Sequence, residues 1–193
     1  MAHSLIYPDG LERCAWPHGD DLYTHYHDTE WGVPIRGDDA MFERIALEGF
    51  QAGLSWITIL KRREGFRAAF HDFEMAKVAQ MTDSDVDRLM TDSGIIRNRS
   101  KIRATIKNAQ LALDLPGGIS DFVWHFAPER GQHSTSVQDF EWKATSRESE
   151  ALSKALRKIG FGFVGPTTMY ALMQATGMLN DHAPNCFRRN TLA

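Results

Sequence analysis

The chain has 193 residues, of which 42% are hydrophobic and 24% charged, and its formal net charge at pH 7 is −3. This composition is ordinary for a soluble globular protein with one domain, or two intimate lobes, and a sizeable core. It argues against a membrane protein, because the longest apolar run is far too short to span a bilayer. Residues 1–11 lack the apolar core of a secretory signal, so a cytoplasmic location is expected, with a monomer as the default.

Helical signals dominate the chain, so the expected fold is all-α. No segment alternates clearly enough between apolar and polar residues to predict a strand. The polar stretch 127–143 is expected to be a mobile connection on the surface. In chain order, helices are expected after the capping residues 37–39, over 54–70, after a capping box at 82–85, over 102–113, from Ser120 to Phe126, after a capping box at 145–148, and over 167–176.

Aromatic residues gather in the segment 22–34, where Tyr23, Tyr26 and Trp31 flank His27. Glu48 follows in a mostly apolar run. Aromatic rings beside a carboxylate suit a pocket for a flat, electron-poor or cationic ring, because the rings stack on it and the carboxylate accepts hydrogen bonds from its edge. The alternative is that the aromatic residues belong to the core and Glu48 is solvated.

Two basic clusters stand out despite the negative net charge. A local basic patch can set the electric field at the face where a nucleic acid docks. A solvated helix face is the ordinary alternative for each cluster. The clusters are Lys61, Arg62, Arg63 and Arg67, and then Arg97, Arg99, Lys101, Arg103 and Lys107.

A glycine-rich turn at residues 160–166 joins the last two expected helices. Its free N–H groups, with the start of the next helix behind them, can receive a phosphate. Pro166 suits the first turn of that helix. The arrangement resembles the helix-hairpin-helix element of DNA repair proteins, although short glycine-rich connections are common and an ordinary turn is the alternative.

The two cysteines of the chain each accompany a histidine, Cys14 with His27 near the start and Cys186 with His182 near the end. Thiolate and imidazole together form the tetrahedral ligand set that zinc prefers, so one zinc ion could tie the two ends of the chain together. Two buried thiols without a metal are the alternative. A disulfide is disfavoured, because nothing indicates an oxidising compartment.

Several motifs together resemble those of the DNA-3-methyladenine glycosylase I family. The resemblance extends from about Arg13 to Cys186, and its motifs are long and stand in the same order. They are the segments Arg13–Trp16, Tyr26–Pro34, Leu47–Ile57, Gly94–Arg97, Gly160–Gly165 and Asn180–His182.

The resemblance implies a base-excision repair enzyme of the helix-hairpin-helix glycosylase superfamily. Such an enzyme hydrolyses the N-glycosidic bond of 3-methyladenine in alkylated double-stranded DNA and releases the free base. Superfamily members that also cut the backbone use a lysine at the hairpin. This chain has Pro166 after Gly165 and no lysine there, so no lyase activity is expected. Asp181 lies where monofunctional members carry an aspartate, but its neighbour His182 constrains it, and it is not assigned as the base.

The resemblance also implies site residues. In the family a structural zinc ion clips the termini together, and the base pocket combines one carboxylate with aromatic rings. The matching zinc ligands are Cys14, His27, His182 and Cys186. The pocket maps onto Glu48, which receives the catalytic role, and onto the substrate-binding residues Tyr23, Tyr26, Trp56 and Trp16.

DNA contacts are expected at Gly162, Gly165 and Leu54, with a core leucine as the alternative for Leu54. The expected organisation is an N-terminal extension at 1–12, one glycosylase domain at 13–187 and a tail at 188–193. A zinc-stapled DNA-binding or scaffold protein without activity is the rival, but it would not need the pocket residues. A hydrolase using zinc-bound water fits poorly, because four protein ligands leave no open position on the metal.

Overall fold

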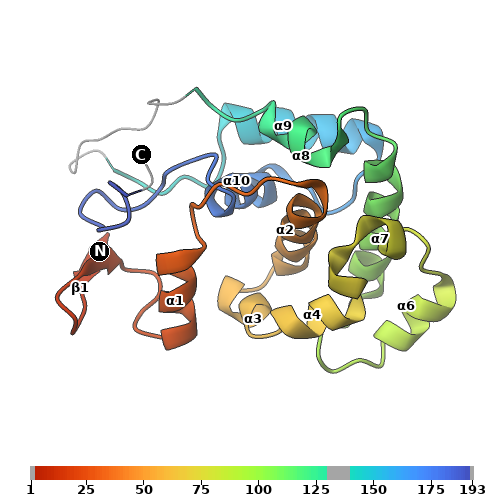
Figure 1. Cartoon of the computed structure of the whole chain (residues 1–193), viewed down its shortest axis with the longest axis horizontal. Coiled ribbons are helices and arrows are strands. Elements are labelled where there is room, and N and C mark those ends of the chain that lie inside the picture. Colours follow the sequence, from red (N-terminus) through yellow and green to blue (C-terminus); the bar gives the residue numbers. More distant parts are fainter. Residues whose placement is uncertain (1–2, 130–139, 192–193) are drawn as a thin grey trace.

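The computed structural model describes residues 3–129 and 140–191. The described chain is mostly helical, as predicted, and α2 lies near its middle (Figure 1). None of the described helices is both long and apolar enough to cross a membrane. The elements are β1 (Ser4–Ile6), β2 (Glu12–Cys14), α1 (Asp21–Thr29), α2 (Asp38–Gln51), α3 (Trp56–Leu60), α4 (Arg63–Ala69), the 3-10 helix η1 (His71–Phe73), α5 (Met75–Val78), α6 (Asp83–Leu89), α7 (Arg99–Leu113), α8 (Gly118–Trp124), α9 (Arg147–Ile159) and α10 (Pro166–Ala175).

Helix α2 is the centre of the fold. Gly37 is its N-cap residue, and Asp38 and Asp39 occupy the first turn, where a carboxylate interacts favourably with the helix dipole. Nearly every residue from 41 to 50 is buried, and the helix packs against α3, α7, α8 and α10. Because α2 is covered on all sides, it is a rigid support for Glu48, which lies on its last turns.

Helices α9 and α10 form a hairpin with glycine at the turn, as predicted. Gly160 follows α9 with a φ of 111°, a conformation that favours glycine. Pro166 occupies the first turn of α10, as predicted. The capping box predicted at 145–148 is displaced, because α9 begins one residue later. Ser146 caps the helix and exchanges hydrogen bonds with Ser149.

Two other helix predictions need correction. The stretch 54–70 forms two helices, α3 and α4, which are separated at Lys61 and Arg62. Helix α8 begins at Gly118 rather than after Ser120. The N–H of Ser120 donates to the carboxylate of Asp38 on α2 at 2.9 Å, so a distant helix supplies part of the cap. The capping box at 82–85 is confirmed.

The prediction that the chain has no strand is wrong for residues 4–14. Strands β1 and β2 pair antiparallel, with Ser4 opposite Cys14 and Ile6 opposite Glu12. Each strand has only three residues, which is too short for an alternating pattern to show in the sequence. The pairing places the buried Cys14 at the end of this small sheet.

The two ends of the described chain lie side by side (Figure 1). The N–H of Phe187 donates to the carbonyl of Glu12 at 2.9 Å. Gly177 follows α10 with a φ of 72°, and a Cβ at this position would lie 2.6 Å from the carbonyl oxygen of Gly32. A glycine therefore lets the C-terminal segment pass close to the end of α1 on its way to the N-terminal hairpin.

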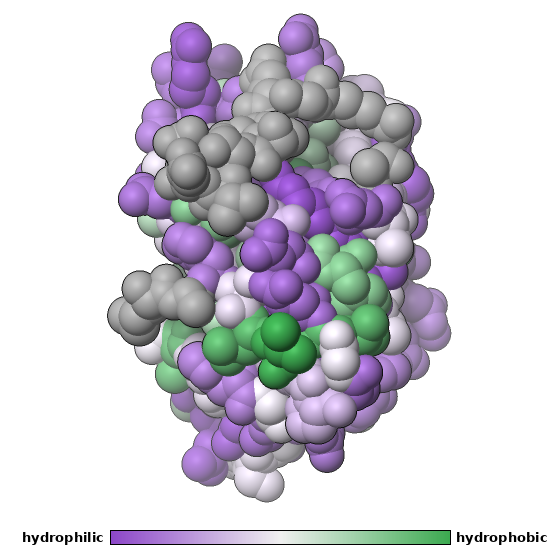
Figure 2. Space-filling model, turned by 90° about the vertical axis from the view of Figure 1, so that its left-hand side faces the viewer, coloured by the Kyte–Doolittle hydropathy of each residue, from purple (hydrophilic) through white to green (hydrophobic). Residues whose placement is uncertain are grey.

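The face formed by the two ends carries most of its apolar surface in one strip. The N-terminal hairpin exposes the side chains of Leu5, Ile6 and Leu11. Figure 2 views this side of the molecule and shows a hydrophobic band across it, with polar residues above and below.

Part of the stretch 127–143, residues 130–139, lies outside the described residues. The described part that follows lies only partly on the surface, contrary to expectation, because Glu141 and Lys143 are exposed but the aromatic residues between and before them are not. Phe140 is buried, and the ring of Trp142 packs against His3 with centroids 5.4 Å apart. The polar composition of the stretch as a whole gave no indication that its aromatic residues would pack in this way.

Candidate active site and metal centre

A cavity of about 290 Å³ lies between α1, α2, α3 and α10. It is large enough for one small planar ring system and is open to the surface. Its walls include every residue predicted for the base pocket, namely Trp16, Tyr23, Tyr26, Glu48 and Trp56.

Glu48 reaches the cavity from the buried helix α2. Its residue surface is 3% exposed, so the alternative of a solvated carboxylate is excluded. Burial raises the pKa of the Glu48 carboxyl to about 8, although the charge of Arg44 lowers it. Its Oε2 atom is buried and has no hydrogen-bond partner among the described residues. A buried carboxyl oxygen without a donor is unfavourable, so this atom is suited to a ligand that supplies one.

Aromatic rings surround Glu48. The ring centroids of Tyr26 and Trp56 are 5.4 Å apart, and those of Trp16 and Tyr23 are 4.7 Å apart. The indole Nε1 of Trp56 is also buried without a partner in the described chain. The cavity therefore combines aromatic faces with an unmet acceptor and an unmet donor, which matches a flat ligand with polar groups on its edge.

The two tyrosine hydroxyls of the cavity stay protonated near neutral pH. Burial raises the pKa of Tyr23 to about 12, and the charge of Glu48 adds to the shift. Burial also raises the pKa of Tyr26 well above its usual range. Both groups can therefore act as neutral hydrogen-bond donors but not as bases.

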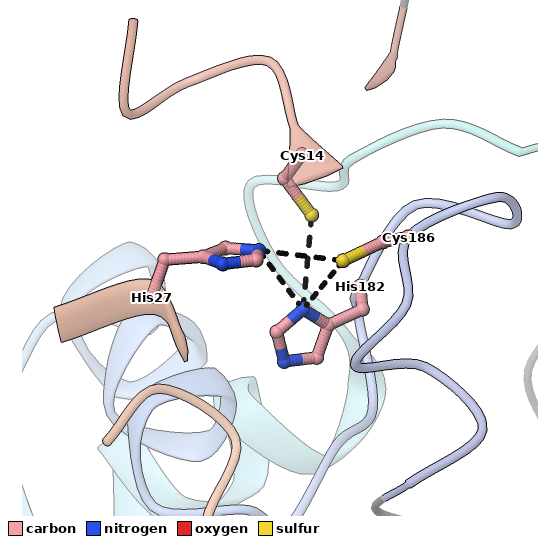
Figure 3. Close-up of side chains that lie close together, drawn as sticks. All are labelled: Cys14, His27, His182 and Cys186. Atoms are coloured by element: carbon pink, nitrogen blue, oxygen red, sulfur yellow. Dashed lines mark hydrogen bonds between the residues drawn. The ribbon is translucent and has the colours of Figure 1, made fainter. Parts of the chain in front are cut away.

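The four predicted metal ligands form one buried cluster (Figure 3). Their ligand atoms all lie within 4.8 Å of one another. Cys14 comes from the end of β2 and His27 from α1, whereas His182 and Cys186 come from the segment after α10. The cluster therefore joins the two ends of the chain, as the Cys/His pattern predicted.

Hydrogen bonds determine which nitrogen of each histidine faces the cluster. The Nδ1 atom of His27 lies 2.7 Å from the carboxylate of Asp28, which only accepts, so Nδ1 carries the proton and Nε2 is free. Arg13 holds the same carboxylate at 3.0 Å. His182 donates from Nε2 to the carbonyl of Trp31 at 3.2 Å, which leaves its Nδ1 free. Both free nitrogens face the cluster.

The arrangement of these atoms fits a bound cation. His27 Nε2 and His182 Nδ1 are 3.2 Å apart, and the sulfur of Cys186 lies 3.4 Å from each. Two lone pairs at this distance repel one another unless a positive charge lies between them. Burial raises the pKa of the Cys14 thiol far above its usual range. Cys14 can therefore be a thiolate beside the sulfur of Cys186 only if a cation lies next to it. Two sulfurs and two imidazoles suit a tetrahedral metal ion with a closed coordination shell.

Two tryptophans connect the cluster of Cys14, His27, His182 and Cys186 with the cavity. The ring of Trp16 lies 5.2 Å from that of His27, and the ring of Trp31 lies 4.6 Å from that of His182. Both tryptophans also line the cavity. The cluster therefore supports one wall of the cavity through ring packing.

The DNA contact predicted at Gly162 needs correction. Its N–H donates to the Oδ1 atom of Asn108 at 2.9 Å, and its carbonyl accepts from Nδ2 of the same side chain at 3.1 Å. The amide of Gly162 is therefore not free for a phosphate. Gly165 is the N-cap residue of α10, a position where an anion is favoured. Leu54 is 42% exposed in the turn after α2, so the alternative of a core leucine is excluded.

Much of the predicted basic surface is neutralised or buried. Arg99 pairs with Asp87, and Arg103 pairs with Asp83 at 2.8 Å. Lys101 is buried. The members of the two basic clusters that have no acidic partner in the described parts of the chain are Arg62, Arg97, Lys101 and Lys107.

Sequence reasoning missed other residues of the cavity wall, among them Gln51, Trp142, Lys143 and Gln174. A signal for Gln51 was available, because it lies three positions after Glu48 and thus on the same side of one helix. Trp142 and Lys143 belong to no motif and follow a polar stretch. Only the folded chain brings them to the cavity.

Asp181 is held by α10. Its carboxylate accepts from the hydroxyl of Tyr170 at 2.6 Å and from Nε2 of Gln174 at 2.9 Å. Its carbonyl accepts from Nε1 of Trp142 at 3.0 Å. These bonds tie three side chains together at the edge of the cavity and are consistent with leaving Asp181 without a catalytic assignment.

Comparisons with known proteins agree on one family. The family described as methyladenine glycosylase matches residues 16–189. DNA-3-methyladenine glycosylase 1 of Escherichia coli (strain K12) is 50% identical over 179 residues, which cover 91% of this chain and 96% of that protein.

Solved structures give the same result. A crystal structure of 3-methyladenine DNA glycosylase I is similar with a TM-score of 0.86 at 47% identity, over 91% of this chain and 98% of that one. A variant of such an enzyme in complex with 3-methyladenine is similar with a TM-score of 0.84 at 37% identity, over 92% and 97% of the two chains. The match in sequence and structure spans nearly the whole molecule, and the chain therefore belongs to the methyladenine glycosylase family.

Proposed function

We propose that the protein is a DNA glycosylase of base-excision repair that removes 3-methyladenine from alkylated double-stranded DNA. The observation that carries the proposal is the aromatic cavity with the Oε2 atom of Glu48, which has no hydrogen-bond partner in the described part of the chain. Two relatives support it: one that is 50% identical is DNA-3-methyladenine glycosylase 1, and a structural relative was solved with 3-methyladenine.

The cavity suits a base taken out of the duplex. Extruding a base costs a few kcal/mol, and less when the base is damaged. Adenine methylated at N3 is cationic while it is attached to the sugar. Stacking on Trp56, a wall of the cavity, would contribute about 1–3 kcal/mol, and cation–π attraction would add to it.

Glu48 would distinguish the cationic base from neutral adenine. In the empty cavity, burial raises the pKa of its carboxyl to about 8. A cationic ring beside it favours the ionised form, which accepts hydrogen bonds from the exocyclic amine. Tyr23 and Tyr26 remain neutral donors and complete the polar edge of the cavity.

The reaction needs little further equipment, because a cationic base is a good leaving group. The bond from the anomeric carbon to the base breaks, its electron pair neutralises the charge of the ring, and 3-methyladenine leaves as a neutral molecule. Water adds to the anomeric carbon and loses a proton. Helix α10 begins at Pro166 directly after Gly165, and residues 160–166 contain no lysine, so we propose hydrolysis without strand cleavage.

We further propose that Cys14, His27, His182 and Cys186 bind one structural zinc ion. The closed set of two thiolates and two imidazoles supports this assignment. Bound zinc would supply no chemistry to the reaction but would hold the end of β2 and helix α1 against the C-terminal segment. Trp16 and Trp31 would transmit this support to the cavity wall.

The proposed DNA contacts lie on two turns. Leu54, exposed after α2, would fill the gap left by the extruded base, and Gly165 at the start of α10 would face a phosphate. Arg97 and Lys107 would bind phosphates of the DNA backbone and would not discriminate between base sequences. We propose a monomer with one glycosylase domain at 13–187, flanked by an extension at 1–12 and a tail at 188–193.

The direct test is incubation of the purified protein with methylated duplex DNA, followed by identification of the released base by mass spectrometry. Release of 3-methyladenine with the DNA backbone intact is expected. Binding of the methylated duplex without base release would instead support the rival function of a zinc-stapled DNA-binding protein. Release of a different base alone would refute the proposed substrate.

A further inference from the structure

Lys101 is a buried lysine whose ammonium binds the end of α2. It lies on α7 and is 7% exposed. Its Nζ atom donates to the carbonyls of Phe50 at 2.9 Å and Ala52 at 2.6 Å. Carbonyls at the end of a helix lack partners within the helix and attract a cation. Burial of an ammonium is unfavourable by itself, so these two contacts account for its place in the interior.

The turn held by Lys101 carries two residues that matter for the proposed function. Gln51 lines the cavity, and Leu54, three positions later, is exposed. Gly53, between them, has a φ of 84°, so the turn leaves the regular helix conformation at this point. Within the turn the N–H of Leu54 donates to the carbonyl of Gln51 at 2.6 Å, and Lys101 adds two contacts from outside α2.

The same helix that carries Lys101 also holds the turn between α9 and α10. Asn108, two helical turns further along α7, bonds both the N–H and the carbonyl of Gly162. The ring of Phe163, in the same turn, lies 5.7 Å from the ammonium of Lys101. Helix α7 thus fixes the turn after α2 and the turn before α10 relative to one another.

We propose that Lys101 is a positioning residue for extrusion of the damaged base. Its ammonium fixes the position of the turn 51–54 relative to the α9–α10 hairpin. Leu54 can then enter the duplex where the base leaves, while the hairpin binds the DNA backbone. The inference rests on the proposed glycosylase function. It requires that Lys101 matter for duplex DNA and matter little for a base that needs no extrusion.

The test uses Lys101→Met, which keeps the length of the aliphatic stem and removes the ammonium. Lys77→Met is the matched control, because Lys77 is exposed and pairs with Glu74 on the surface. Excision is measured on methylated duplex and on single-stranded DNA of the same sequence, and binding of free 3-methyladenine is followed by tryptophan fluorescence. For Lys101→Met, kcat/KM on duplex should fall about tenfold or more. Single-stranded excision and base binding should change by less than about threefold, and the control should match the wild type.

A double-mutant cycle identifies the route of the effect. If Lys101 acts through the turn of Leu54, adding Lys101→Met to Leu54→Ala should lower duplex excision far less than it does in the wild type. Lys101→Arg keeps the cation and should restore most of the duplex activity. If Lys101→Met is too unstable to purify, Lys101→Gln, which keeps a donor on a shorter side chain, replaces it with the same expectations.

Several results would overturn the inference. Equal losses on duplex and single-stranded DNA, or a parallel loss of free-base binding, would show that Lys101 only supports the fold. Unchanged duplex activity, or additive losses in the cycle with Leu54→Ala, would also contradict it. Failure of the proposed function is a separate outcome, because the wild type would then release no 3-methyladenine before any variant is compared.

Discussion

The cavity and the Cys/His cluster share a wall, but their polar atoms differ in how completely they are hydrogen-bonded. In the cluster, the outward nitrogens of His27 and His182 are bonded to Asp28 and to a backbone carbonyl. In the cavity, Oε2 of Glu48 and Nε1 of Trp56 have no partner among the described residues. The surroundings of the cluster are complete for a permanent occupant, whereas the missing partners in the cavity must come from a molecule that binds and leaves.

Replacement of Cys186 by serine should have the largest effect on stability, because it removes one of the four residues of the Cys/His cluster. Serine is a poor zinc ligand, so most of the bound metal should be lost, and the free energy of unfolding should fall by about 4 kcal/mol. The metal-to-protein ratio by mass spectrometry and urea unfolding measure the two effects. Chelation of the wild type should reproduce both, and an unchanged metal content in the variant would contradict the cluster's role.

Glu48→Gln changes the cavity and should leave the fold intact. Loss of the negative charge facing a cationic base should lower kcat/KM for 3-methyladenine release by about 100-fold. Thermal stability should be unchanged or higher, because an amide avoids the cost of a buried ionisable group. Glu150→Gln, at an exposed position on α9, is the matched control. Full activity of Glu48→Gln would remove Glu48 from the mechanism.

The stability of the protein should also depend on pH through Glu48. Burial raises its pKa to about 8, from 4.5 for the ordinary side chain. Between these values the folded protein holds a proton that the unfolded chain has lost. The free energy of unfolding therefore falls as pH rises, by up to about 1.4 kcal/mol per pH unit. Urea unfolding measures this free energy, and the value for the wild type should fall increasingly below that of Glu48→Gln as the pH rises from about 5 to about 8. A constant difference between them would mean that Glu48 is ionised in the fold.

Trp142→Phe should have the smallest effect and tests whether Trp142 belongs to the binding site. The variant keeps an aromatic ring but loses the 3.0 Å bond to the carbonyl of Asp181, so stability should fall by about 1 kcal/mol. Binding of 3-methyladenine, followed by fluorescence, should weaken about threefold. Trp124→Phe is the control, because it loses a similar bond to the carbonyl of Ile35 at 2.8 Å. Equal base affinity in both variants would place Trp142 outside the binding site.

Elements with local end signals were predictable from the sequence, and elements defined by distant contacts were not. The box at 82–85 and Gly160 mark helix ends with their own side chains or backbone. The start of α8 depends on Asp38, which is far away in sequence, and strands of three residues carry no readable period. Long-range contacts of this kind have no local signature.

The candidate site shows the same division. The four cluster residues and part of the cavity wall could be named from their motifs, but the rest of the wall and the surroundings of these residues could not. Nothing in the sequence shows that Oε2 of Glu48 lacks a donor or that Trp142 reaches the cavity. The choice between a metal site and two buried thiols depends on the 3.2 Å approach of His27 Nε2 to His182 Nδ1, which only folding creates.

The bond from the N–H of Ala183 to the sulfur of Cys14 joins residues 169 positions apart. During synthesis Cys14 and His27 leave the ribosome long before His182 has been added. The ring of His27 beside Trp16 then still lacks its contacts with His182 and Cys186. Contacts so distant in sequence form slowly and late. The cluster therefore cannot form until the segment with His182 and Cys186 has been synthesised, and a chain cut short before His182 would lack the cluster's contacts with Trp31.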